Sequence, residues 1–480
     1  MTPHPIRQIR SMAFSSLALT RSLTICGLAV AVGALPAIGE DWPRFLGTSG
    51  QLKAEATEKT PTKWGDGENV KWATELPGKG VSSPIVVGDL VFVTCYSGYG
   101  VGGENESIDD LTRHVICVDK ATGKVRWQNE IKAVQPEDPY EGVGVPAHGY
   151  ASHTPVSDGK RVYAFLGKSG VVAFDLDGNE LWRQSVGTGS GPQGWGSSAS
   201  PVVYQDTLIV TASEESETMF GINAESGEIK WKQEAQDLQS TWSTPTLVTS
   251  EEGRTDLVIN VPGEVWGINP ETGKLRWYSR GTTDASTAAS LTPGNGLVFA
   301  TGGRGGEAVA VKVGGKGDVN DTHVIWDAKI PGRFSTPLYH NDLLFTFGDS
   351  IMTVFSAEDG DKVGQLRLGS SSSRGGRGAS DGGDGEGNDG EGGGREGGGR
   401  RGGGRGGMFS MDYASPVLIG DNIYMTSRSG TVYVLTATRS PELIAENSFP
   451  GDSGFGGTPA VSDGEIFIRS DSKLYCLSNK

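Results

Sequence analysis

Seven side chains that could bind a ligand stand at corresponding places along the chain, each a few residues before a Ser/Thr-Pro step. They comprise two imidazoles, two indoles, a guanidinium, a phenol and a phenyl ring: His148, His153, Trp195, Trp242, Arg333, Tyr413 and Phe455. Aromatic rings supply flat apolar surface, and imidazole and guanidinium groups add directed hydrogen bonds. Brought together, these groups would form a site for a small ligand or a peptide. The alternative interpretation is that the aromatic rings fill the centre of the fold as ordinary core.

The steps divide the chain into repeating units. Seven of the eight steps are Ser/Thr-Pro: Ser83-Pro84, Thr154-Pro155, Ser200-Pro201, Thr244-Pro245, Thr336-Pro337, Ser415-Pro416 and Thr458-Pro459. Ser290-Leu291 fills the one gap in register. Most successive steps lie 43–46 residues apart, and the two longer intervals contain insertions. Eight units of this length indicate eight structural repeats.

Each unit contains short apolar runs separated by turn residues. In Thr241 to Gly281 the runs are PTLV, DLVIN, EVWGIN and KLRWYS. Short runs rich in β-branched and aromatic residues and bounded by turn residues are typical of strands. Four strands in about 40 residues is the pattern of one propeller blade. We therefore expect an all-β, eight-bladed β-propeller whose inner strands line the axis, so that the seven side chains converge on one mouth of the channel.

The eighth unit ends the chain after three strands, TPAV, EIFIR and KLYCL. The missing fourth strand is predicted at the other end of the chain, where Asn69 to Pro77 (NVKWATELP) resembles an outermost strand without inner strands before it. A circular array closes only if this N-terminal strand completes the last blade, and closure removes two exposed sheet edges. Trp72 would then be the counterpart of Trp127.

A second marker closes most units, a turn Gly followed four residues later by Trp. It stands in the segments CVDKATGKVRW, GINAESGEIKW and GINPETGKLRW. Gly supplies the positive φ of the hairpin turn, and we expect the Trp ring to pack against the next blade. This motif resembles the tryptophan-docking repeat of the pyrroloquinoline-quinone (PQQ) propeller superfamily. The Trp-Pro-Arg-Phe-Leu-Gly segment from Trp42 to Gly47 also resembles the opening of secreted PQQ-like repeat proteins from planctomycete-type bacteria.

The resemblance to this superfamily implies several functions. The superfamily includes quinoprotein dehydrogenases and the propeller lipoprotein of the outer-membrane barrel-assembly machinery. Its alcohol dehydrogenases are recognised by a vicinal Cys-Cys disulfide, calcium-binding acids and amides, and a catalytic Asp. This sequence contains no Cys-Cys pair and no C-x-x-C-H haem motif. We therefore expect a non-catalytic scaffold for a protein, peptide or glycan, with no catalytic residue, metal or cofactor. The alternatives are a PQQ- and Ca²⁺-dependent alcohol or sugar dehydrogenase and an outer-membrane protein assembly factor.

The first 39 residues are expected to be an export signal. They combine a basic start, an apolar run from Leu23 to Ala34, and small residues in Ala37-Ile38-Gly39. We therefore predict a periplasmic or secreted protein without a membrane span in the mature chain. Residues 40–68 are expected to form an extended segment, and residues 69–480 the propeller of a monomer. The net charge of −16 disfavours binding to nucleic acid.

Two further features bear on the fold. Residues 370–407 form a Gly-, Arg- and acid-rich insertion with almost no apolar side chain, which we expect to be disordered. The chain has four cysteines, one of them in the export segment. Cys95 and Cys117 are predicted on consecutive strands, so either a disulfide or two buried free thiols is possible, and free thiols are the favoured interpretation.

Overall fold

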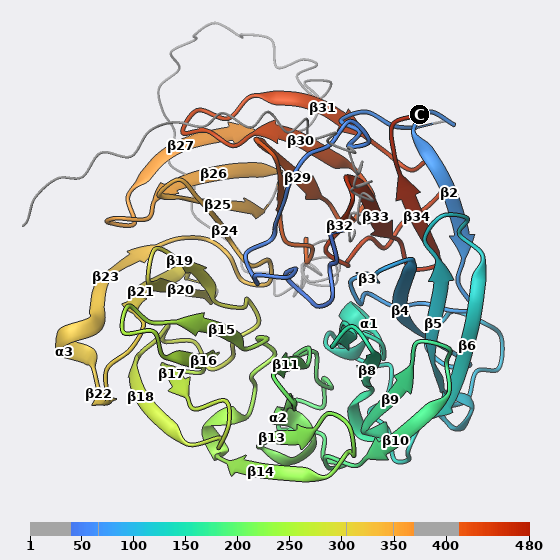
Figure 1. The fold of residues 1–480 in the computed structure, drawn as a ribbon, viewed down its shortest axis with the longest axis horizontal. Helices are drawn as coiled ribbons and strands as arrows, with labels where there is room; N and C mark the ends of the chain where they lie inside the picture. The colour runs from blue at the N-terminus through green and yellow to red at the C-terminus, as the bar shows by residue number, and fades with distance from the viewer. Residues whose placement is uncertain (1–39, 66, 304, 349, 369–411) are drawn as a thin grey trace, which may run out of the picture. The chain divides into compact units, whose positions relative to one another are not determined.

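The computed structural model describes residues 40–65, 67–303, 305–348, 350–368 and 412–480. The predicted export segment (1–39) and the low-complexity insertion (370–407) lie outside the described residues. The described chain is almost all β and forms eight sheets arranged as blades around a central axis (Figure 1). The prediction of an eight-bladed β-propeller is confirmed.

The first four blades follow each other along the chain, each an antiparallel meander from the axis outward. Blade 1 is β3 (Ile85–Val87), β4 (Leu90–Ser97), β5 (Thr112–Asp119) and β6 (Val125–Lys132), with η1 (Ile108–Asp110) between β4 and β5. Blade 2 is β7 (Val156–Ser157), β8 (Arg161–Phe165), β9 (Val171–Asp175) and β10 (Glu180–Gln184), with η2 (Gly167–Ser169). Blade 3 is β11 (Val202–Tyr204), β12 (Thr207–Ala212), β13 (Thr218–Asn223) and β14 (Ile229–Glu234), with α2 (Ser213–Ser216). Blade 4 is β15 (Thr246–Thr249), β16 (Thr255–Val261), β17 (Glu264–Ile268) and β18 (Leu275–Arg280). Helix α1 (Val145–His148) precedes blade 2, and η3 (Gln236–Leu238) precedes blade 4.

The remaining blades complete the circle. Blade 5 is β19 (Thr292–Gly294), β20 (Leu297–Gly302), β21 (Glu307–Lys312) and β23 (Val324–Lys329), with α3 (Asn320–His323); β22 (Gly317–Asp318) extends blade 4. Blade 6 is β24 (Leu338–His340), β25 (Leu343–Gly348), β26 (Ile351–Ser356) and β27 (Lys362–Arg367). Blade 7 is β28 (Val417–Ile419), β29 (Asn422–Thr426), β30 (Val432–Thr436) and β31 (Leu443–Asn447). Blade 8 is β32 (Ala460–Ser462), β33 (Glu465–Arg469), β34 (Lys473–Leu477) and β2 (Val70–Glu75).

Strand β2 closes the ring as predicted. It pairs antiparallel with β34 (Figure 1). Trp72 lies opposite Cys476 in this pairing. The Trp72 ring reaches from this strand to blade 1, where Nε1 donates to the Lys120 carbonyl at 2.9 Å. The last blade is therefore built from both ends of the described chain, and no edge is left unpaired between β2 and β34.

The same tryptophan contact recurs between successive blades. Trp127 Nε1 donates to Leu176 O at 2.9 Å, and Trp182 Nε1 donates to Ala224 O at 3.2 Å. The ring lies against the turn Gly of the following blade, whose φ is positive; at Gly178 an added Cβ would lie 2.7 Å from the Trp127 ring. The prediction that these rings pack against the turn of the next blade is confirmed for Trp127, Trp182 and Trp231, whereas Trp277 lies against Gly267 and donates to Asp256 Oδ2 of its own blade. Where the contact forms, the turn must be Gly both for its φ and for this close approach.

The Ser/Thr of each step joins neighbouring blades at the axis. In every blade its backbone N–H donates to the side-chain hydroxyl of the equivalent residue in the next blade, at 2.9 to 3.2 Å. The eighth bond runs from Thr458 N to Ser83 Oγ and returns to the first blade. The hydroxyls therefore form a closed circle of eight hydrogen bonds. This circle explains why Ser290 can serve at the one step that has Leu in place of Pro, because the hydroxyl is the group that makes the bond.

The N-terminal segment crosses the far end of the axis. Trp42 exchanges two 2.9 Å backbone hydrogen bonds with Val86 of β3, and Ser157 N in blade 2 donates to Pro43 O. Strand β1 (Lys53–Ala54) then pairs in parallel with β28 of blade 7. The innermost strands begin at the hydroxyl circle and run away from the predicted mouth, so this segment closes the opposite end of the channel. Trp42 is only 2% exposed.

The three cysteines among the described residues are buried free thiols. Cys95 lies opposite His114, whereas Cys117 lies opposite Phe92, so the register of β4 and β5 holds the two thiols apart along the strands. The favoured interpretation is confirmed and the disulfide is excluded. In the described part of the chain, none of the helices combines the length and apolar character needed to cross a bilayer.

Candidate functional site

A cavity lies on the axis between the predicted mouth and the N-terminal segment. It holds about 1040 Å³ of empty space when its open mouth is counted. Its walls include seven residues of the hydroxyl circle: Ser83, Thr154, Ser200, Thr244, Ser290, Thr336 and Thr458. Phe45 of the N-terminal segment lines it from the far end. The cavity is therefore a closed-ended pocket with a hydroxyl-bearing wall and an aromatic floor.

Five of the seven predicted site residues line this cavity: His148, Trp195, Trp242, Arg333 and Tyr413. The indole rings of Trp195 and Trp242 stack with their centroids 5.6 Å apart and an interplanar angle of 29°. Trp242 Nε1 donates to the Gly196 carbonyl at 2.7 Å, which fixes the orientation of that ring. The structure thus brings together side chains that are separated by up to 265 residues in sequence.

Phe455 and His153 lie behind the cavity wall. The Phe455 ring is 0% exposed and packs 5.0 Å from the Phe449 ring as part of the core. His153 lies with its ring centroid 4.3 Å from that of Phe165. Its Nε2 is 3.0 Å from Ser197 Oγ, and burial lowers its pKa to about 3. His153 is therefore neutral at physiological pH.

Ser197, His153 and Glu215 lie together but do not form a hydrolytic triad. Ser197 Oγ donates to Glu215 Oε1 and also contacts the imidazole. In a Ser-His-acid triad the carboxylate orients the imidazole, and the imidazole then contacts the serine. Here the acid contacts the serine instead, and Ser197 is 5% exposed. This geometry offers no activated nucleophile.

His148 is fixed at the cavity by α1. Its Nε2 lies 2.9 Å from the Trp195 carbonyl and its Nδ1 lies 2.6 Å from Ser152 Oγ. Because a carbonyl can only accept, Nε2 carries the proton and Nδ1 faces the hydroxyl. Burial lowers the pKa of His148 to about 4, so the ring is neutral at physiological pH. It presents a polar, uncharged wall.

Sequence reasoning missed three residues of this region. Phe334 lines the cavity, and the Arg333 guanidinium carbon lies 5.0 Å from its ring centroid. The Arg428 guanidinium carbon lies 5.5 Å from the ring centroid of Tyr413, another lining residue. Phe45, the floor, belongs to the segment that was predicted only as extended. Phe334 could have been found because it adjoins Arg333, whereas Arg428 and Phe45 stand outside the step register.

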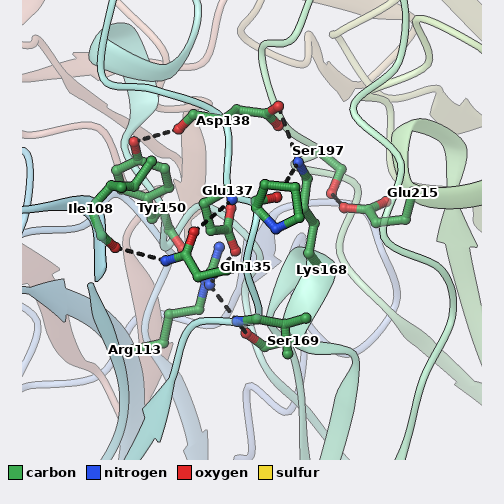
Figure 2. A network of polar contacts seen from close by, with 12 residues as sticks. Ile108, Arg113, Gln135, Glu137, Asp138, Tyr150, Lys168, Ser169, Ser197 and Glu215 are labelled. Carbon is green, nitrogen blue, oxygen red and sulfur yellow. Dashed lines mark hydrogen bonds and ion pairs between the residues drawn. The ribbon is translucent and has the colours of Figure 1, made fainter. Parts of the chain in front are cut away.

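A buried network of charged groups holds the loop that carries α1 (Figure 2). Lys168 Nζ lies 3.1 Å from Asp138 Oδ1 and donates to the Pro136 carbonyl at 3.0 Å. Arg113 Nε donates to the Tyr150 carbonyl at 3.1 Å, and its Nη1 lies 2.7 Å from Glu137 Oε1. The latter is an ion pair without hydrogen-bond geometry, because Oε1 has no hydrogen-bond partner. These cations anchor residues 136–150 and thereby place His148 at the mouth.

Glu215, at the edge of this network, should make stability depend on pH. It is 5% exposed, and burial raises its pKa from 4.5 to about 7. Between these values the folded chain retains a proton that the unfolded chain has released, so stability falls as pH rises through this window. Glu215→Gln stays neutral and should escape that loss, gaining on the order of 1–3 kcal/mol over wild type between pH 5 and pH 8.

Thermal unfolding of both proteins across this pH range measures the difference. The stability of the variant must be compared with that of wild type at each pH, because His148 and His153 have lowered pKa values in the folded chain. These two histidines make stability fall as pH drops below 6.5, which is opposite to the effect of Glu215. Glu228→Gln, an exposed surface change, is the control. If the difference in stability between Glu215→Gln and wild type were the same at all pH values, the prediction would be wrong.

The described lining of the cavity lacks the oxygen ligands that a calcium-bound quinone requires. Ca²⁺ takes six to eight oxygen ligands in which carboxylates are prominent. Among the residues that the structure describes, the cavity lining contains no Asp or Glu. Within the described ranges, no group of three or more His, Cys, Asp or Glu side chains is placed to hold a metal ion.

The comparisons with known proteins agree with this architecture. A family model described as "Outer membrane protein assembly factor BamB" matches residues 111–366, more than half of the chain. A polyvinylalcohol dehydrogenase from a Pseudomonas species is 24% identical over 258 residues. That match covers 45% of this chain and only 36% of the dehydrogenase.

Among solved structures, a europium-containing methanol dehydrogenase superimposes with a TM-score of 0.61 at 11% identity, covering 92% of this chain and 98% of that chain. BamB from Moraxella catarrhalis superimposes with a TM-score of 0.53 at 13% identity, covering 85% of this chain and 98% of that chain. At these identities the structural likeness establishes the fold alone. The match of the family model to more than half of the sequence goes further, and the chain belongs to the PQQ-like propeller family that this BamB model describes.

Proposed function

We propose that this protein is a non-catalytic binding scaffold of the cell envelope, and that it captures a protein or peptide partner at the cavity mouth. The observation that carries the proposal is the composition of the mouth. Two Trp rings stack there, Arg333 lies over the Phe334 ring, and Arg428 lies over the ring of the lining residue Tyr413. The described lining residues include no acid. Trp, Tyr and Arg are the residues that dominate binding energy at protein interfaces.

Four further points support this choice over catalysis. Both histidines near the cavity have low pKa values, so neither is poised for proton transfer at neutral pH. The described lining residues include no carboxylate to serve as a general base or to hold Ca²⁺. The closed end of the cavity suits the insertion of a side chain or a chain end. The family model's description as an assembly factor is consistent with a protein partner.

The proposed location outside the cytoplasm rests on the sequence. The basic and apolar pattern of residues 1–39 favours export, and the family model carries the description of an outer-membrane factor. Fractionation of cells that express the full chain tests it. Recovery of a shortened protein in the periplasm or medium is expected, and full-length protein confined to the cytoplasm would contradict it.

Mouth substitutions should weaken partner capture. Trp242→Ala and Arg333→Ala should each cost about 2 kcal/mol of binding, roughly 30-fold in affinity, because truncating a central Trp or Arg removes stacking and directed hydrogen bonds. Partners are retained from an envelope extract on immobilised protein, identified by mass spectrometry, and then titrated in purified form. Arg280→Ala, which removes an exposed outer-strand arginine, is the matched control and should bind as wild type.

The same preparation separates the alternatives. A partner that binds all three variants equally would place recognition away from the mouth. A glycan array tests whether the partner is a carbohydrate. If a glycan binds where no protein does, and Trp242→Ala loses that binding, the partner is a glycan and not a protein. PQQ- and Ca²⁺-dependent reduction of an artificial electron acceptor by an alcohol or sugar would establish the dehydrogenase alternative.

A further inference from the structure

A side pocket adjoins the cavity mouth between blades 8 and 1. It contains about 270 Å³ of empty space and is lined in part by Lys79, Tyr140, Arg428 and Asp471. His148 and Val81 line both this side pocket and the main cavity. A ligand that enters the mouth could therefore place one group in each.

The side pocket is locally basic in an acidic protein. It presents two cations, Lys79 and Arg428, against one carboxylate, Asp471, whereas the whole chain carries a net charge of −16. Local charge of this sign attracts an anionic group and orients it as it approaches. The described part of the main cavity lining adds no acid that would repel such a group.

Arg428 is held in place, but one of its guanidinium nitrogens has no hydrogen-bond acceptor among the described residues. Its backbone N–H donates to Asp412 Oδ1 at 2.8 Å, and its guanidinium carbon lies 5.5 Å from the Tyr413 ring centroid. Nη1 is buried and has no hydrogen-bond partner among the described residues. It also approaches the main cavity, because a Cβ added to Gly456 would lie 2.6 Å from it. A buried guanidinium N–H without an acceptor is costly, and an oxygen supplied by a ligand would remove that cost.

We propose that the side pocket is a carboxylate subsite, and that the mouth takes a peptide in which a carboxylate adjoins an aromatic or aliphatic side chain. The apolar group enters the main cavity beside Trp195 and Trp242, and the carboxylate binds Arg428 with Lys79. Phe45 closes the far end of the cavity, so the peptide enters from the mouth and does not thread through. The carboxylate comes from a chain terminus or from an Asp or Glu side chain. This inference rests on the proposed function.

Three short peptides test it by titration against Trp fluorescence and calorimetry. The first ends in Phe with a free carboxylate, the second is its C-terminal amide, and the third has an amidated end and an internal Phe-Glu pair. The free acid should bind wild-type protein about tenfold more tightly than the amide, because a guanidinium–carboxylate pair is a charge-assisted hydrogen bond. Arg428→Gln should reduce this ratio to near one, and Arg428→Lys should restore part of it.

Arg183→Gln, an outer-strand change, should leave the ratio unchanged, and melting curves show whether each variant is folded. Tight, Arg428-dependent binding of the Phe-Glu peptide would support the subsite with a side chain as the source of the carboxylate. Equal binding of acid and amide to wild type, with loss of both in Trp242→Ala, would overturn the subsite and leave capture at the mouth intact. Failure of all three peptides to bind would overturn the subsite, while capture of a purified partner lost in Trp242→Ala would still uphold the proposed function.

Discussion

Truncating Trp72 should destabilise the propeller by about 3 kcal/mol, since removing a large aromatic ring from a packed site typically costs this much. The ring lies against Gly123 of blade 1, where an added Cβ would be 2.7 Å away, and its centroid is 6.0 Å from that of Phe467 in blade 8. Trp72→Ala thus removes a contact on both sides of the point where the circle closes. Chemical denaturation measures the loss.

Trp72→Phe is the matched control. It keeps an aromatic ring between the blades but removes the Nε1 donor to Lys120 O, so a loss of about 1 kcal/mol is expected. Deleting residues 40–77 should have a stronger effect, because β34 would then expose an unpaired edge and the protein should aggregate. A monomeric deletion protein with an unchanged melting temperature would show that closure contributes nothing to stability.

Breaking the buried pair between Arg113 and Glu137 should cost about 3–5 kcal/mol, because it leaves an uncompensated buried charge. The two side chains are 4% and 3% exposed and their charged atoms are 2.7 Å apart. Arg113→Met removes the cation and also the hydrogen bond to the Tyr150 carbonyl. The loop that carries His148 should loosen, and binding at the mouth should weaken together with stability.

The double variant Arg113→Met with Glu137→Gln distinguishes charge from packing. It contains no unpaired charge at this position, so it should recover more than half of the stability lost in the single variant. Denaturation curves of the wild type, both single variants and the double variant complete the cycle. A double variant as unstable as Arg113→Met would mean that the hydrogen bonds from Arg113 to the Tyr150 carbonyl and to Ser169 Oγ, rather than charge pairing, carry the effect.

The sequence by itself determined the architecture of this protein. The step hydroxyls and the Gly–Trp turns are local signals. The hydroxyls make the same contact with the neighbouring blade in all eight repeats, and the rings of Trp72, Trp127, Trp182 and Trp231 lie against the turn Gly of the next blade. Thr244 accepts from Ser200 and donates its own N–H to Ser290, so the spacing of these residues already implies a circle. The three-strand end and the isolated strand around Trp72 imply its closure. Such features are readable because strand, turn and repeat depend on neighbouring residues.

Only the tertiary structure decided which side chains face the cavity. His153 and Phe455 precede their steps as Trp242 does, yet they turn into the core, because the loop backbone before each step follows its own path. Arg428 comes from a hairpin that carries no marker, and Phe45 reaches the floor only because Trp42 pairs with Val86. Likewise, the offset between Cys95 and Cys117 is set by strand register. These placements depend on packing between segments far apart in the chain, which residue types and spacing do not specify.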